Sequence, residues 1–167
     1  MNFNTDRKME VKDKAGFCQN EIKMHMKILL VEDNEGDILL TQEALYESNP
    51  ETKLHIVRDG EAALDYIFKK GRYKNAESPE LIILDINIPR KNGHEVLRTL
   101  KASKEYCMIP IIFLTTSTAD KDIIDGYKNG VNCYVVKDFI FDDLNHVVVQ
   151  IEQFWRTVAS IPNAAHA

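Results

Sequence analysis

The chain has 167 residues, 44% of them hydrophobic and 28% charged, with a formal net charge of −5. This length suits one globular domain with a substantial core and leaves too little chain for two. The acidic balance argues against nucleic acid as a partner, because phosphate backbones bind basic patches. No apolar run approaches the roughly 18 residues that a membrane-spanning helix requires, so no membrane span is expected.

The first 25 residues mix charges of both signs and lack a regular hydrophobic pattern. They have no apolar signal-peptide core, so we expect a disordered or extended leader. Residues 26–160 are expected to form the folded domain, followed by a short tail at 161–167 and no output domain. The three cysteines, an odd set without a CxxC spacing, fit a reducing cytoplasm: Cys18, Cys107 and Cys133.

Five short aliphatic runs recur along the chain, at 27–31, 53–57, 80–84, 110–114 and 132–136. Runs that are apolar at nearly every position are typical of strands buried on both faces of a parallel sheet. An amphipathic stretch of helical period follows each run. This alternation predicts right-handed crossovers and a doubly wound α/β fold. We expect a five-stranded parallel sheet of flavodoxin-like order 2-1-3-4-5, whose switch point lies between strands 1 and 3.

Caps and stop signals predict where the first two helices begin and end. Either Asn34 or Asp37 caps the first helix, which runs to about Ser48, before an Asn-Pro pair. Asp59 opens the second helix, which we expect to end near Gly71.

Gly93 precedes the third helix, and the adjacent His94 is expected to be a solvated helix residue. Either Thr118 or Asp120 caps the fourth helix, which ends at an Asn-Gly pair. The expected inward face of this fourth helix carries Ile123, Ile124 and Tyr127.

The last helix has Asp142 and Asp143 in its first turn, where the helix dipole favours acidic side chains. Two aromatic residues near its end either join the core or cover a partner. Its apolar residues recur at the 3–4 spacing of a core-facing stripe: Leu144, Val147, Val148, Ile151, Phe154, Trp155 and Val158.

Polar residues follow four of these strands at the point where each strand ends. Such ends open onto one edge of a parallel sheet, which is the usual ligand site of α/β folds. An aspartate at a strand end is often only a turn or cap residue, but here five polar residues converge. They are Glu32, Asp33, Asp85, Thr115 and Lys137.

This set of residues suits phosphoryl transfer. Crowded carboxylates repel one another unless a cation neutralises them, and open oxygen sites favour Mg²⁺ together with a substrate phosphate. Asp85, after the central strand, is the best-placed nucleophile for a phosphoryl group. Lys137 can supply a second cation to the phosphoryl oxygens, and the Thr115 hydroxyl can donate a hydrogen bond to one of them.

Four motifs at these strand ends resemble one known family. They are Val31-Glu32-Asp33-Asn34, Leu84-Asp85-Ile86-Asn87-Ile88-Pro89 with Gly93, Leu114-Thr115-Thr116-Ser117 and Tyr134-Val135-Val136-Lys137. In this order, over residues 27 to about 158, the chain resembles a response-regulator receiver domain of CheY-like fold. The acidic motif 32–37, the long connection 70–79 and the closing helix at 151–155 resemble the small phytochrome-associated members.

The resemblance implies how the acidic residues act. Asp85 is the phospho-acceptor, and Lys137 is the second cation beside it. Mg²⁺ is bound by Asp33, Asp85 and the backbone carbonyl of Asn87, while Glu32 acts through a coordinated water.

The resemblance also implies a switch pair, Thr115 and Tyr134. The hydroxyl moves toward the phosphate and the ring turns inward, although from the residues alone Tyr134 could also be core filler. Asn87 and Ser117 should influence how fast water removes the phosphate. Asp138 stands where the family usually has proline, often in cis; because a non-proline cis bond costs about 3–4 kcal/mol, we expect a trans bond there.

By this resemblance, the chain would be a single-domain response regulator of a cytoplasmic two-component phosphorelay. It would accept a phosphoryl group from a sensor histidine kinase, in the finer resemblance one of phytochrome type. It would then signal to a downstream protein target or phosphotransfer protein. The fourth helix, fifth strand and last helix form the expected output and homodimer surface. Its catalysis would be limited to its own phosphotransfer and dephosphorylation.

Two other functions remain open at this point. A receiver-like module could act by constitutive interaction without phosphate, for which the unusual Asp138 is the only support. A phosphatase of the haloacid dehalogenase type could use Asp85 as nucleophile. Such enzymes have a second aspartate two residues later as general acid, and Asn87 in that position cannot donate and retrieve a proton.

Overall fold

The structure is a computed structural model that describes residues 25–137 and 144–162. Predictions about Cys18, Asp138, Asp142 and Asp143 lie outside the described residues, as do those about the leader and most of the tail. The elements are β1 (Lys27–Val31), α1 (Glu35–Ser48), β2 (Lys53–Val57), α2 (Gly60–Ile67), η1 (Gly71–Tyr73), β3 (Leu81–Leu84), α3 (Gly93–Lys101), β4 (Ile111–Thr115), α4 (Asp120–Lys128), β5 (Cys133–Val136) and α5 (Leu144–Thr157).

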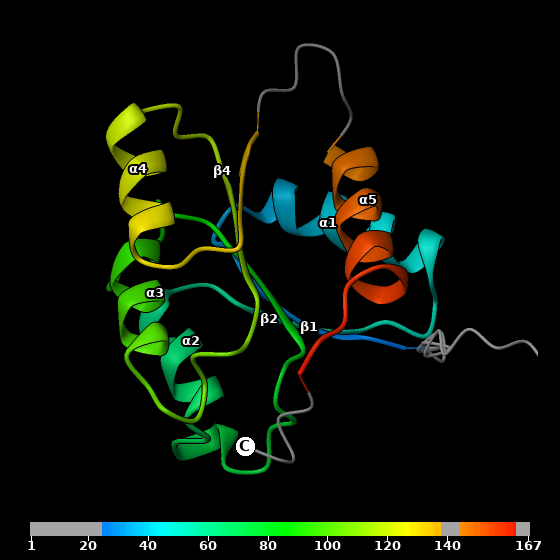
Figure 1. Ribbon diagram of the computed structural model, residues 1–167. Helices are drawn as coiled ribbons and strands as arrows, with labels where there is room; N and C mark the ends of the chain where they lie inside the picture. Colours follow the sequence, from blue (N-terminus) through cyan, green and yellow to red (C-terminus); the bar gives the residue numbers. More distant parts are fainter. Residues whose placement is uncertain (1–24, 138–143, 163–167) are drawn as a thin grey trace, which may run out of the picture.

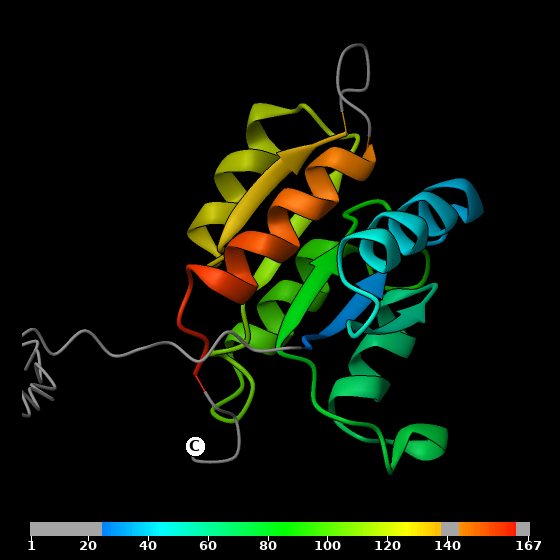
Figure 2. The ribbon, with the colours of Figure 1, turned by 90° about the vertical axis from the view of Figure 1, so that its right-hand side faces the viewer.

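The five strands form one parallel sheet in the order β2-β1-β3-β4-β5, which confirms the predicted doubly wound fold. Helices α2, α3 and α4 cover one face of the sheet, and α1 and α5 cover the other (Figure 1). Figure 2 views the molecule from the side of α1 and α5. No helix in the described part of the chain is long and apolar enough to cross a membrane.

The alternation of side chains along each strand explains the uninterrupted aliphatic runs. In β3, Ile82 and Leu84 belong to the core under α2 and α3, whereas Leu81 and Ile83 belong to the core under α1 and α5. All four side chains are fully buried. Burial of each contributes about 1.5–3 kcal/mol, so both cores depend on the central strands.

A buried carboxylate of α5 connects the two helices on the second face. Glu152 of α5 is fully buried, and its Oε1 accepts hydrogen bonds from Arg156 Nε at 2.7 Å and Asn49 Nδ2 at 3.4 Å. Because Asn49 caps the C-terminus of α1, these contacts fix α5 against the end of that helix.

Side-chain caps start the first three helices. Asn34, rather than Asp37, caps α1 and accepts from the Asp37 N–H at 3.1 Å. Asp59 caps α2 in the same way, and Asn92 forms a complete capping box at α3. The prediction that the second helix ends near Gly71 is wrong, because α2 ends at Ile67. Positive φ angles soon after Ile67 interrupt the helical path, at Lys69 and Gly71.

The predicted inward face of the fourth helix is wrong for two of its three residues, while Ile123 is half-buried. Ile124 and Tyr127 of α4 are 51% and 54% exposed, and the residue buried against the sheet is Gly126. A Cβ at Gly126 would lie 3.2 Å from the Phe113 ring, so α4 approaches β4 too closely for larger side chains at this contact. The predicted N-caps, Thr118 and Asp120, are also wrong, since the N-cap is Ala119, without a side-chain hydrogen bond, whereas the predicted end at the Asn-Gly pair is confirmed by the C-cap Asn129.

The apolar stripe predicted for the last helix is buried only in part. Leu144, Val148 and Ile151 are buried, whereas Phe154 is 50% exposed and Val158 lies beyond the helix, 66% exposed. Of the two aromatic residues near the end of α5, Trp155 packs partly buried against this core, whereas Phe154 faces outward.

Candidate functional site

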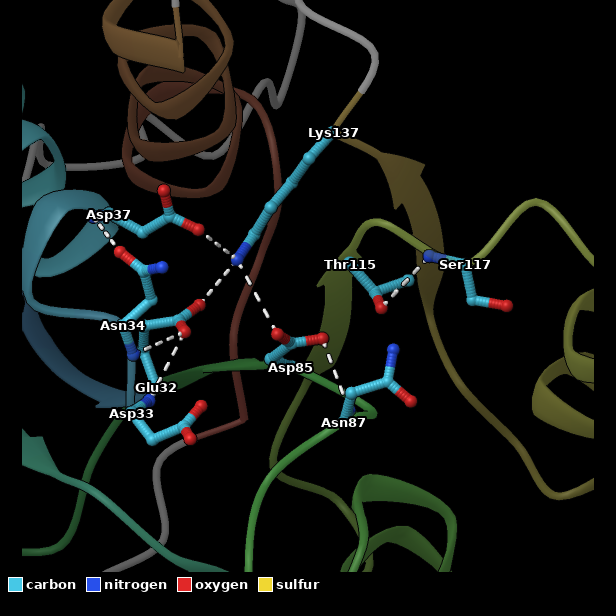
Figure 3. Close-up of polar contacts among 9 residues, drawn as sticks. All are labelled: Glu32, Asp33, Asn34, Asp37, Asp85, Asn87, Thr115, Ser117 and Lys137. Carbon is cyan, nitrogen blue, oxygen red and sulfur yellow. Dashed lines mark hydrogen bonds and ion pairs between the residues drawn. The ribbon is translucent and has the colours of Figure 1, made fainter.

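The predicted polar residues do meet at the carboxyl edge of the sheet (Figure 3). Backbone hydrogen bonds extend the strand ladders to these positions, from Glu32 N to Val57 O and from Asp85 N to Val31 O. Four of these polar side chains are buried, with exposures of 0–7%: Glu32, Asp85, Thr115 and Lys137. Since buried charges are costly unless they are paired, the contacts among them determine what the site can do.

Lys137 is the centre of the site. Its ammonium donates to Glu32 Oε2 and to Asp37 Oδ2, the latter at 2.7 Å, and lies 3.5 Å from Asp85 Oδ2 (Figure 3). Burial lowers the pKa of Lys137, but the hydrogen bonds to Asp37 and Glu32 and the charge of Asp85 outweigh it, so that its pKa is raised. Lys137 is therefore a permanent cation shared by carboxylates from three segments.

Glu32 is held from two sides. Its Oε1 accepts from the backbone N–H groups of Asp33 at 3.1 Å and Asn34 at 3.0 Å, while its Oε2 contacts Lys137. Burial raises the pKa of Glu32, and the contacts with Lys137 and Asn34 oppose that rise. These contacts fix the carboxylate at the end of β1.

Asp85 presents its two oxygens to different partners. Its Oδ1 accepts from the Asn87 N–H at 3.3 Å, and its Oδ2 faces Lys137. The start of α3 packs against the backbone of this residue, because a Cβ at Gly93 would lie 2.5 Å from the Asp85 carbonyl oxygen. The carboxylate is thus only 7% exposed, yet it points to the edge of the sheet.

The hydroxyl of Thr115 and the ring of Tyr134 lie around the loop after β4. Thr115 Oγ1 accepts from the Ser117 N–H at 3.3 Å, and Tyr134 donates through its hydroxyl to the Ser117 carbonyl at 3.0 Å. The Tyr134 ring packs edge-on against Phe113, with centroids 5.8 Å apart. Burial raises the pKa of Tyr134, so this phenol stays protonated as a donor.

Asp33 differs from the other acids because it is exposed. No contact to its carboxylate is drawn in Figure 3, and this carboxylate has no hydrogen-bond or ion-pair partner among the described residues. Within residues 25–137 and 144–162, no three His, Cys, Asp or Glu side chains are grouped closely enough to hold a metal as they stand. The donor set still fits Mg²⁺, since an unpaired carboxylate beside Asp85 and a backbone carbonyl at Asn87 are hard oxygen ligands.

Asp37 is the site residue that the sequence reasoning missed. The sequence indicates it only as an alternative helix cap within the acidic motif 32–37, whereas its carboxylate binds Lys137. The available signal was the stronger cap at Asn34, which leaves the Asp37 side chain free in the first turn of α1. That turn directly follows β1, so a side chain there can reach the same edge as Glu32.

The sheet is doubly wound, and acidic residues follow β1 and β3, a hydroxyl follows β4, and a buried lysine follows β5. This combination is typical of a domain that receives a phosphoryl group as a signal. This chain belongs to the response regulator receiver domain family, whose model matches residues 28–149. Its function is accordingly phosphorylation-dependent two-component signalling.

Two relatives match most of the chain. Response regulator Rcp1 of Synechocystis sp. is 42% identical over 137 residues, 82% of this chain and 93% of that protein. The probable methanogenesis regulatory protein FilR2 of Methanothrix harundinacea is 39% identical over 129 residues, 77% of this chain and 82% of that protein.

Solved structures agree with the fold. The phosphorylated cyanobacterial phytochrome response regulator RcpA has a TM-score of 0.80 and 43% identity, covering 83% of this chain and 99% of that one. The Mn²⁺-bound form of response regulator Rcp1 has a TM-score of 0.78 and 41% identity, with the same coverage.

Proposed function

We propose that this receiver domain accepts a phosphoryl group on Asp85 from the phosphohistidine of a sensor kinase. The observation that carries the proposal is the contact between Asp85 and Lys137, whose buried ammonium lies 3.5 Å from the carboxylate. A carboxylate oxygen forms the new O–P bond while the P–N bond of phosphohistidine breaks. The electron pair of that bond returns to the imidazole of the kinase.

Charge neutralisation is the main catalytic contribution of this chain. An aspartyl phosphate adds roughly −1.5 to −2 charges, so cations must face it. Lys137 supplies one cation, and the Thr115 hydroxyl donates to a phosphoryl oxygen. Catalysis is limited to the phosphorylation of Asp85 and the loss of its phosphate, because Asn87 lacks the acid function that a phosphatase needs at its position.

Mg²⁺ is the proposed second cation. Asp33, Asp85 and the carbonyl of Asn87 would hold it, with Glu32 acting through a water. The unpaired carboxylate of Asp33 supports this assignment, as does the Mn²⁺-bound form of the relative Rcp1. When bound, the metal supplies positive charge for the phosphoryl oxygens and the developing acyl phosphate.

The proposed signal is a change at the surface formed by α4, β5 and α5. Thr115 would move its hydroxyl toward the phosphoryl group, and the ring of Tyr134 would turn inward. The same surface would bind a downstream protein target or phosphotransfer protein, or a second copy of the chain.

The likeness to RcpA supports a kinase of phytochrome type as the phosphoryl donor. The proposed receiver has the bounds 26–160 and would work in the cytoplasm.

Intact-mass measurement after incubation with acetyl phosphate and Mg²⁺ tests the acceptor. We expect one phosphoryl group on the wild type and none on Asp85→Asn or without Mg²⁺. An adduct that persists in Asp85→Asn would contradict the acceptor assignment. Absence of any adduct, together with no binding of beryllofluoride, would favour the phosphate-independent interaction module instead.

A further inference from the structure

Ser117 connects both members of the proposed switch pair. Its backbone N–H donates to Thr115 Oγ1 at 3.3 Å, and its carbonyl accepts from the Tyr134 hydroxyl at 3.0 Å. Because one residue supplies both contacts, a shift of Ser117 changes the surroundings of both switch residues together.

The side chain of Ser117 is held by α4. Its hydroxyl points away from Thr115 (Figure 3) and donates to Asp122 Oδ2 at 2.5 Å. A hydrogen bond to a carboxylate is about twice as strong as a neutral one. The N-cap residue of α4, Ala119, provides no side-chain cap, but its N–H also donates to Ser117 Oγ at 3.4 Å, so Ser117 connects the start of α4 to the preceding loop.

His94 of α3 lies on the other side of Asp122. His94 Nε2 lies 3.5 Å from Asp122 Oδ1, and the His94 side chain is only 12% exposed, which corrects its prediction as a solvated residue. Neither ring nitrogen of His94 has a hydrogen-bond partner within the described residues. The imidazole also packs edge-on against Phe113, the ring on which Tyr134 rests.

We propose that Asp122 is a positioning residue for the phosphorylation switch. This inference rests on the proposed function of Asp85. Asp122, backed by His94, fixes Ser117 so that its carbonyl receives the Tyr134 hydroxyl and its N–H orients Thr115. Without Asp122, the loop after β4 loses its anchor on α4, and Tyr134 loses a fixed acceptor in its inward position. In such a variant the loop after β4 must first be ordered, and the free energy of ordering it weakens the binding of a phosphoryl group.

The affinity for beryllofluoride, a phosphoryl mimic, at saturating Mg²⁺ measures this cost without hydrolysis. We expect Asp122→Ala to weaken binding roughly 3- to 10-fold, the effect of one lost hydrogen bond to a charged group in a partly exposed site. Asp122→Asn should recover part of the loss, because its amide oxygen still accepts from Ser117. The matched control is Asp120→Ala, which removes an exposed carboxylate from the same helical turn and should bind like the wild type.

Two further measurements separate positioning from general damage to the site. The Mg²⁺ affinity of Asp122→Ala without beryllofluoride should equal that of the wild type, because Asp122 is not a proposed ligand. Ser117→Ala breaks the same hydrogen bond from the loop side, so combining it with Asp122→Ala should add no further loss.

The possible results are distinguishable. Wild-type affinity in Asp122→Ala, or additive losses in the double variant, would overturn the role of Asp122. An equal loss of Mg²⁺ affinity would overturn it as well, since that result marks damage to the whole site. Failure of the wild type itself to bind beryllofluoride would instead reject the proposed function.

Discussion

At the scale of single residues, the site depends on one ammonium shared by several carboxylates. Lys137 contacts Glu32, Asp37 and Asp85, so the group keeps an excess of negative charge. Two unit charges at about 4 Å interact by roughly 4 kcal/mol at the effective dielectric of a protein surface. This excess favours a divalent cation and resists an incoming phosphoryl group until that cation arrives.

Asp37 competes with the phosphoryl group for Lys137. We expect Asp37→Asn to bind beryllofluoride about threefold more tightly at saturating Mg²⁺, because the ammonium is then freer to face the mimic. The matched control is Glu35→Gln, which removes the same charge from the same turn of α1 but from an exposed pair with Arg58. Titration of both variants measures the difference. Equal affinities in the two variants would show that only long-range charge matters.

At the scale of elements, the start of α3 lies very close to the end of β3, the strand that Asp85 follows. The Gly93 N–H donates to the Ile86 carbonyl at 2.9 Å, and a Cβ at Gly93 would lie 2.5 Å from the Asp85 carbonyl oxygen. Backbone atoms cannot move aside as a flexible side chain can. Gly93 therefore allows α3 to approach the backbone at Asp85, the proposed phospho-acceptor.

Gly93→Ala should lower the free energy of unfolding by about 1–3 kcal/mol, the usual cost of forced overpacking. Gly36→Ala, in the first turn of α1, is the control. Its new Cβ would meet only the Asn34 side chain at 3.1 Å, and alanine is the better helix former by roughly 1 kcal/mol. Urea unfolding measures both variants. A stability loss in Gly93→Ala no larger than in Gly36→Ala would contradict the close approach.

The connection after α2 is held by an aromatic cluster. His55 of β2 stacks on Tyr66 with centroids 4.2 Å apart and meets Tyr73 edge-on at 5.8 Å. Burial, and next the charge of Arg72, lower the pKa of His55 below its ordinary value of 6.5. On acidification the unfolded chain therefore binds a proton at this residue before the folded protein does.

His55 should make the protein less stable in acid. The stability that this residue contributes is present above pH 6.5, its pKa in the unfolded chain. It is lost as the pH falls toward the lower pKa that His55 has in the folded protein. The melting temperature of His55→Gln should therefore fall less between about pH 7.5 and about pH 5.5 than that of the wild type. His146→Gln, at an exposed position on α5, is the control and should keep the wild-type slope. An unchanged slope in His55→Gln would refute the assignment.

At the scale of the whole molecule, one sheet separates two cores, and the switch residues lie next to α4. The exposed apolar side chains of this helix, Ile124 and Tyr127, follow Asp122 within two turns. In the proposed switch, phosphorylation would order the loop after β4 and so change the start of this apolar surface. Such a surface suits a second copy of the chain better than solvent.

We expect Mg²⁺ and beryllofluoride to raise the dimer fraction in sedimentation velocity, and Tyr127→Glu to abolish that rise. Burying a carboxylate in an apolar interface is unfavourable, so the substitution acts on association and leaves the site intact. Tyr46→Glu, at a residue of α1 that is 70% exposed, is the control and should dimerise like the wild type. Dimerisation that survives Tyr127→Glu would exclude α4 as the contact.

Local pattern was sufficient for the fold and for most of the site. Aliphatic runs and caps are properties of neighbouring residues, so the five strands and their order follow from them. The strand ends likewise bring Glu32, Asp85, Thr115 and Lys137 together, because parallel strands share one edge. The inward face of α4 was predicted wrongly, since periodicity does not state how near a helix lies to its sheet.

Only the tertiary structure decided which polar side chains meet. The pairing of Asp37 with Lys137 joins residues far apart in the chain, and the His94–Asp122–Ser117 contacts join two helices and a loop. Such contacts depend on distances between elements that no local spacing encodes. The sequence by itself determined a receiver with an acidic edge, whereas packing determined which residues hold its lysine and its switch loop.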